Sequence, residues 1–148
     1  MGAGAAPPVR GLRPVAAVAP GVAAATGLSL QQLAAALVGQ LRPAAVVCVD
    51  SLCSAEGQRL GRTVQFSDAG LYPAQADHTR HLTRDTLGVP VVAAGIPTLM
   101  QAQEGADLVV TPRALDSVIA HGAALLAGSV NRALQPRLTV QQLCWLTG

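Results

Sequence analysis

The clearest strand of this 148-residue chain is AAVVCV at residues 44–49, which Asp50 follows directly. Its residues are all apolar or small, and three are valine, which predicts a strand buried on both faces of a parallel sheet. An acid at the carboxyl end of such a strand lies where open α/β sheets place their ligands and chemistry. Asp50 is therefore the first candidate site residue. The alternative is that Asp50 caps a turn or helix formed by residues 51–54.

The composition is that of a globular domain. Apolar residues make up 51% and charged residues 12% of the chain, whereas disordered chains are poor in apolar residues. We expect a flexible leader at residues 1–12 and a single α/β domain at 13–148. The net charge of +2 is small and scattered, which argues against a nucleic-acid-binding protein. No uninterrupted apolar run reaches about 18 residues, so no membrane span is expected.

The elements before Asp50 predict a strand, a helix and a second strand. Residues 15–19 are apolar and predict a short strand. Ser29 predicts the N-cap of a helix, and Gly39 and Pro43 bracket the end of that helix. Together with the strand at 44–49, this order implies a right-handed crossover and parallel pairing of the two strands.

Beyond Asp50 the pattern predicts two further strands, at 62–66 and 89–94. The polar residues between them, 72–84, predict an exposed loop. Residues 95–98 are predicted to turn the chain, with Pro97 at the first position of a helix. The sheet is therefore expected to be partly parallel and flanked by helices.

Two helices are predicted at the carboxyl end. Thr111 predicts an N-cap, with Pro112 as the first residue of a long helix that ends at Leu134. Thr139 predicts the cap of a short final helix.

Several stretches of the chain are idiosyncratic in sequence. They are AVAPGV at 17–22 with TGL at 26–28, VVCVD at 46–50 with TVQFSDAG at 63–70, LTRDTLGVPVVAAGIPT at 82–98, and VVTPR with LDSVI between 109 and 119. Together they resemble the germination protease family, the endopeptidases that degrade small acid-soluble spore proteins in endospore-forming bacteria. The resemblance runs from about residue 14 to about residue 134.

The resemblance implies an α/β fold related to the hydrogenase-maturation proteases. It implies an atypical aspartic endopeptidase that acts during spore germination, in the cytoplasm of the forespore or spore core. Two aspartates are essential in the family, and one lies at the end of the strand matched by residues 46–50, so Asp50 is the position carried over. The implied partner is a protein substrate, with a homo-oligomer as the expected assembly and no cofactor or metal.

The chain departs from the family pattern at its amino end. The other aspartate of the family belongs to an earlier strand and loop, and nothing in residues 1–12 resembles that segment. Asp50 is the first acidic residue of the chain. We therefore expect a fragment, a wrongly started reading frame or a shortened paralogue, whose sheet lacks the family's amino-terminal strand and helix. An exposed apolar sheet edge and association of copies should follow.

The remaining site candidates each have a structural alternative. Asp68 follows a predicted strand and is a possible second acid, although capping of its own turn is the simpler reading. Gly95, Pro97 and Thr98 are expected at the rim of the site. Arg80 and Arg84 are candidates for guiding an acidic substrate, against the alternative of solvated loop charges.

Metal and cysteine chemistry have weaker support in the sequence. Asp77, His78 and His81 are close enough in sequence to suggest a metal site, but the loop supplies no third close ligand. Cys53, near Asp50, suggests a nucleophile for which no histidine is evidently placed. The three cysteines show no metal-type spacing, and Cys48 is predicted to be a buried apolar residue.

Three functions are thus open. The leading prediction is an aspartate-dependent endopeptidase with an incomplete site. The first alternative is an inactive paralogue or fragment that acts as a binding or assembly module. The second is a metal-assisted peptidase.

Overall fold

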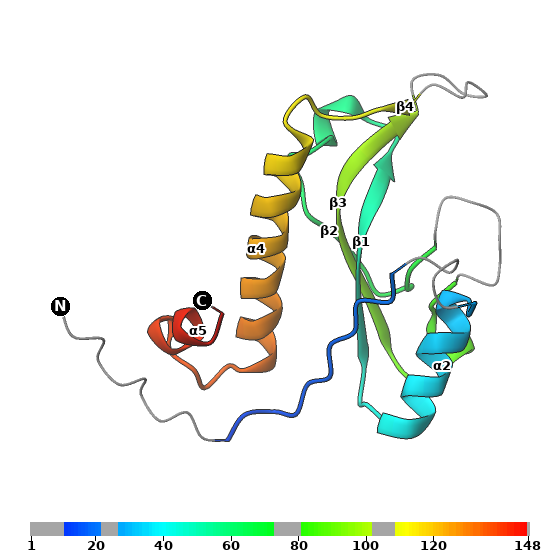
Figure 1. Ribbon diagram of the computed structural model, residues 1–148, viewed down its shortest axis with the longest axis vertical. Helices are drawn as coiled ribbons and strands as arrows, with labels where there is room; N and C mark the ends of the chain where they lie inside the picture. Colours follow the sequence, from blue (N-terminus) through cyan, green and yellow to red (C-terminus); the bar gives the residue numbers. More distant parts are fainter. Residues whose placement is uncertain (1–10, 22–26, 73–80, 102–108, 148) are drawn as a thin grey trace. The chain divides into compact units, whose positions relative to one another are not determined.

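The computed structural model describes residues 11–21, 27–72, 81–101 and 109–147 (Figure 1). The chain forms two compact units, one of residues 18–119 and one of residues 1–17 with 120–148. The expected leader lies mostly outside the described residues, and the single domain expected over 13–148 stays a prediction.

The unit of residues 18–119 is built on a mixed sheet. Its strands follow the order β1-β3-β2, and β4 pairs with β3 as well. β1 and β3 are parallel, whereas β2 and β4 run antiparallel to β3. The elements are α2 (Leu30–Leu41), β1 (Val46–Ser54), the 3-10 helix η1 (Gly57–Arg59), β2 (Gln65–Ser67), α3 (Arg84–Leu87), β3 (Val91–Gln101) and β4 (Val109–Val110). The predicted α/β class with a partly parallel sheet is confirmed.

Helix α2 begins as predicted. The Ser29 hydroxyl accepts a hydrogen bond from the Gln32 N–H (3.1 Å), and the Gln32 side chain accepts one from the Ser29 N–H (2.9 Å). This reciprocal capping box satisfies two backbone donors that would otherwise lack partners at the helix start. The helix continues through Gly39 to Leu41, and Arg42 ends it in the left-handed conformation (φ 48°), directly before Pro43.

Within the described part of this unit, one face of the sheet carries the hydrophobic core, and on the other face β1 is exposed whereas Ala94 of β3 is buried. Cys48, Val91 and Ala93 form a core with Leu71, Leu82 and Leu87, and side chains of α2 pack against that core. On the opposite face of β1, Val47 is 41% and Val49 57% exposed. The prediction that this strand is buried on both faces was therefore wrong, because α2 covers only the face that carries Cys48.

Strand β3 extends through the segment that was predicted to turn. Gly95, Ile96, Pro97 and Thr98 are all strand residues, and no helix begins at Pro97. Proline lacks a backbone N–H, so it fits a strand only where no ladder bond is needed from it. Here the Pro97 carbonyl accepts a hydrogen bond from the Gly61 N–H (2.7 Å), in the gap between the segments of β3 that pair with β2 and β4. The missing donor of Pro97 therefore interrupts no strand pairing.

Two other sequence predictions were wrong. Residues 15–19 form no strand and are exposed, so the parallel partner of β1 is β3, which follows it in sequence. The predicted exposed loop at 72–84 includes buried residues: Leu82 bridges to Leu71, and Thr83 caps α3. Residues 73–80 lie outside the described part of the chain.

The second unit contains most of α4 (Leu115–Leu134) and α5 (Val140–Thr147). Helix α4 begins three residues after the predicted Pro112, and α5 is capped as predicted, by the Thr139 hydroxyl that accepts the Gln142 N–H (3.2 Å). Arg132 closes the turn between these helices by donating to the carbonyls of Pro136 and Leu138. None of the described helices is long and apolar enough to cross a membrane.

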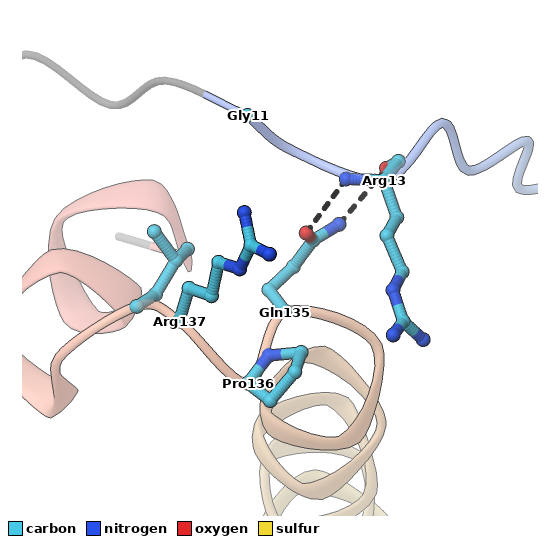
Figure 2. Close-up of a pocket in the computed structure, with 6 residues that line it drawn as sticks. Gly11, Arg13, Gln135, Pro136 and Arg137 are labelled. Atoms are coloured by element: carbon cyan, nitrogen blue, oxygen red, sulfur yellow. Dashed lines mark hydrogen bonds between the residues drawn. The ribbon is translucent and has the colours of Figure 1, made fainter.

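Figure 2 shows how the amino-terminal segment is held in this unit. The Gln135 side chain accepts the Arg13 N–H (2.8 Å) and donates to the Arg13 carbonyl (2.9 Å). Around this contact lies an open pocket of about 240 Å³. Its lining residues are Gly11, Arg13, Gln135, Pro136, Arg137 and Leu138.

Candidate functional site

Asp50 lies in the middle of β1, not at its end. The strand continues to Ser54, and Asp50 is exposed. Because side chains alternate along a strand, Asp50 points to the same face as Cys48 and Leu52. The expectation of a strand-end acid was wrong, since the pairing with β3 extends past Asp50.

Hydrogen bonding identifies the backbone groups of β1 that face outward. The Val46 N–H donates to the Pro90 carbonyl (2.9 Å), and Val46 pairs with Val91. In a parallel ladder alternate residues bond to the same neighbour, so the backbone groups of Cys48 and Asp50 also face β3. Those of Val47, Val49 and Ser51 face the outer edge, where no described strand pairs with β1.

The Asp50 carboxylate binds at this outer edge. Its Oδ1 accepts the outward-facing Ser51 N–H at 2.8 Å. This bond lies within the strand, so Asp50 does not cap a following turn or helix. It fixes one carboxylate oxygen and leaves the other directed to solvent on an exposed residue.

Gly95 lies opposite Asp50 in the sheet. A Cβ at position 95 would be 2.3 Å from the Asp50 carbonyl oxygen and 2.7 Å from the Leu52 Cγ. Only glycine allows this close approach of the two strands beside the candidate carboxylate. Pro97 and Thr98 are buried in β3, so their side chains are not accessible to a substrate in this structure.

Asp68 is not brought next to Asp50. Ser67, the residue before it, pairs with Ala93 and so lies at the level of Cys48 on the far side of β3. Strand spacing then gives about 12 Å between the Cα atoms of Asp50 and Ser67, and Asp68 follows in the direction away from Asp50. The turn after β2 is held by Ser67, whose hydroxyl accepts the Ala69 N–H (3.2 Å). The structure therefore shows neither a carboxylate pair of Asp50 and Asp68 nor a capping hydrogen bond from Asp68.

Cys48 is the titratable neighbour of Asp50 on the same face. Burial raises the pKa of the Cys48 thiol, and the negative charge of Asp50 raises it further. This keeps the Cys48 thiol protonated, and the predicted role as a buried apolar residue agrees with the structure. Cys53 and Cys144 are exposed, and all three cysteines are free.

The loop candidates are only partly described. The rings of His81 and Tyr72 lie 4.9 Å apart, and Arg84 is an exposed first residue of α3. Asp77, His78 and Arg80 lie outside the described residues. In the ranges that the structure describes, no three acidic, histidine or cysteine residues cluster as metal ligands.

Comparison with known proteins identifies the family. A sequence model of germination proteases matches residues 8–104, which include Asp50, Asp68 and Gly95. The chain belongs to the germination protease family. The germination protease of Clostridium perfringens strain SM101 is 28% identical over 180 residues, which cover 89% of this chain and 55% of the relative.

Other germination proteases match shorter regions at higher identity. That of Halalkalibacterium halodurans is 37% identical over 113 residues, covering 75% of this chain and 29% of the relative. The germination protease of Bacillus subtilis strain 168 is 38% identical over 94 residues, which cover 62% of this chain and 26% of the relative. The chain thus spans about half the length, or less, of the germination proteases it matches. The 180 aligned positions of the first comparison also exceed the length of this chain, so that relative has additional residues within the aligned region.

Sequence reasoning missed two structural features around Asp50. One is the open edge of β1, and the other is the Ser51 N–H that orients Asp50. The alternation of exposed Val47 and Val49 with buried Cys48 carried no signal in the sequence, because valine and cysteine are equally apolar.

Proposed function

We propose that this chain carries part of the active site of a germination-protease-type endopeptidase, with Asp50 as one catalytic carboxylate. The proposed substrates are small acid-soluble spore proteins, and the proposed location is the spore core or forespore. The observation that carries the proposal is the placement of Asp50. Asp50 is exposed on β1, at the edge that no described strand pairs with. It lies opposite Gly95, where the close approach of the two backbones requires a glycine, and inside the region matched by the family model.

The chemistry assigned to Asp50 is that of a general base. The Ser51 N–H holds Oδ1, and the second oxygen is free to accept a proton from a water molecule that attacks the scissile carbonyl. A second, protonated acid would polarise that carbonyl or donate to the leaving nitrogen. Two carboxylates that share a proton do this in aspartic proteases.

Asp68 does not supply the second acid in this arrangement. At more than about 10 Å from Asp50, the two carboxylates cannot share a proton. We therefore propose that the complete site needs an acid from outside the described residues. We also retain, as part of this proposal, the expected relation of the fold to the hydrogenase-maturation proteases.

The experiment offers a small acid-soluble spore protein to the purified chain and follows cleavage by mass spectrometry. Asp50→Asn is expected to lower the rate by about 10²-fold or more, as for loss of a general base. Asp116→Asn, a change of an exposed acid in the first turn of α4, is the matched control and should leave the rate unchanged. Cleavage that survives Asp50→Asn refutes the assignment of Asp50.

A binding or assembly module is the second candidate function. The separation of Asp50 from Asp68 favours it, because a lone carboxylate supplies only half of the chemistry. In that case the folded chain associates or binds protein without cleaving it, and Asp50→Asn changes neither property. A metal-assisted peptidase remains a third proposal, resting on His78 and His81, and full activity in the presence of a chelator would exclude it.

A further inference from the structure

Gln65 lies in the same row of the sheet as Asp50. Gly95 of β3 pairs with Asp50 on one side and with Gln65 of β2 on the other. Residues that are directly paired across a sheet point to the same face, so both side chains rise from the face that carries Cys48. Two strand spacings put the Cα atoms of Asp50 and Gln65 about 10 Å apart.

This row is the first one beyond the hydrophobic core on that face. In the preceding row, Cys48 pairs with Ala93, and both residues are buried in the core. One row further, Asp50 is exposed and Gln65 is half-buried. The row of Asp50 and Gln65 is therefore where this face becomes accessible to a ligand.

Between these two polar side chains the sheet presents a low apolar surface. Gly95 is buried and has no side chain. The Leu52 Cγ is 2.7 Å from the point where a Cβ at position 95 would lie, so the Leu52 side chain leans over the glycine. An apolar floor of this kind strengthens the hydrogen bonds that polar groups beside it make to a ligand, because the local dielectric is low.

The Gln65 side-chain amide is available for such a bond. It forms no hydrogen bond to the residues that the structure describes. Every buried polar side-chain atom of those residues has a partner, so the amide atoms of Gln65 must contact solvent. An amide offers one acceptor and two N–H donors, which match the N–H and carbonyl groups of a peptide bond.

We propose that Gln65 is a substrate-binding residue, whose amide holds the substrate main chain at the peptide group next to the scissile bond. This inference rests on the proposed function, because Asp50 marks where the scissile bond lies. A general base and a binding group must each reach about 3 Å to the substrate. A separation of about 10 Å between their Cα atoms is that of two groups on either side of one extended chain. Since all peptide groups offer the same donor and acceptor, Gln65 orients substrates independently of their side chains.

Titration with a small acid-soluble spore protein, followed by NMR, tests this contact. In an Asp50→Asn background, which keeps the added protein intact, the side-chain NH₂ signals of Gln65 should shift; Gln65→Ala assigns those signals by removing them. Gln65→Ala should weaken binding by about 5- to 10-fold, as for loss of one hydrogen bond. Gln65→Glu keeps the length of the side chain but loses both N–H donors, and it should weaken binding at least as much. Gln40→Ala, at an exposed glutamine of α2, is the matched control and should bind as the background protein does. Circular dichroism checks that each variant folds.

Affinity and cleavage together separate this inference from the proposed function. Unchanged affinity in both Gln65 variants, in a chain whose cleavage still depends on Asp50, would overturn the inference alone. Weaker binding by both variants, in a chain that cleaves nothing, would support Gln65 as a binding residue and count against the endopeptidase. A chain that does not bind the spore protein at all would contradict both.

Discussion

At the scale of single residues, the surroundings of Asp50 depend on two small neighbours. Gly95 lets β3 approach the Asp50 carbonyl, and the Ser51 N–H orients the carboxylate. Neither contact uses a large side chain. Substitutions that add atoms here should therefore act through the backbone.

Gly95→Ala should destabilise the unit by about 1–3 kcal/mol, because the added methyl overlaps the Asp50 carbonyl oxygen and forces the strands apart. Urea denaturation followed by circular dichroism measures this. The matched control is Gly39→Ala in α2, where a Cβ meets nothing within 4 Å. There alanine should stabilise by about 0.5–1 kcal/mol, as in other helices. Equal effects of the two changes would contradict the close approach.

Cys48 makes stability depend on pH. Burial, and then the charge of Asp50, raise the pKa of the Cys48 thiol in the folded chain. As the pH rises, the unfolded chain therefore loses the thiol proton at a lower pH than the folded chain does. The stabilising contribution is complete below the ordinary thiol pKa of about 8.5 and is lost as the pH rises through the raised value.

The free energy of unfolding should therefore fall more steeply above about pH 8.5 with Cys48 than with Cys48→Ala, both in the Cys53→Ser/Cys144→Ser background. Denaturant titrations at several pH values measure the two slopes. Asp50→Asn should reduce the difference without removing it, because burial is the larger cause. Identical slopes would show that the Cys48 thiol is as exposed to water as in the unfolded chain.

At the scale of elements, local chemistry fixes where α2 begins, and long-range packing fixes which face of the sheet it covers. The capping box of Ser29 and Gln32 lies within four residues of sequence. In contrast, α2 supplies no residue that is fully buried, and its partly buried side chains pack on Cys48 and neighbouring core residues.

Ser29→Ala should cost about 1 kcal/mol of stability, because the Gln32 N–H loses its acceptor. Thermal unfolding monitored at 222 nm reports the change. Gln40→Ala, an exposed position near the other end of α2, should stay within about 0.5 kcal/mol of the unchanged protein. A loss at Gln40 as large as that at Ser29 would argue against the cap as the cause.

At the scale of the whole molecule, the chain joins residues far apart in sequence within each unit. In the unit of residues 1–17 and 120–148, Gln135 holds the backbone of Arg13 across 122 positions (Figure 2). This unit contains four arginines and no acidic residue, so polar and apolar contacts must hold it together without ion pairs between its side chains.

Gln135→Ala should release the Arg13 amide to solvent. Loss of a hydrogen bond of ordinary strength predicts exchange of that amide with deuterium faster by roughly 2- to 10-fold. Amide exchange measured by NMR tests this, with Gln141→Ala at an exposed position of α5 as the control. An unchanged exchange rate at Arg13 would mean that Gln135 does not hold the segment in solution.

Sequence alone determined the features that depend on neighbours within a few residues. These are the helix started by Ser29, the cap at Thr139, the core of β1 around Val46 and Cys48, and Asp50 as the residue to examine. The family resemblance was also contained in the sequence, and the match over residues 8–104 confirms it. Such signals are local because capping and strand propensity act over one turn or one strand.

Tertiary structure decided what depends on pairing and coverage. Pro97 lies inside β3 because its missing donor faces a gap in the ladder, which no local pattern reveals. Among the described residues, one face and one edge of β1 are open because α2 covers one side and β3 pairs with one edge. The distance from Asp50 to Asp68 follows from the register of three strands. Each of these outcomes requires residues distant in sequence to meet, and periodicity within one segment does not contain that information.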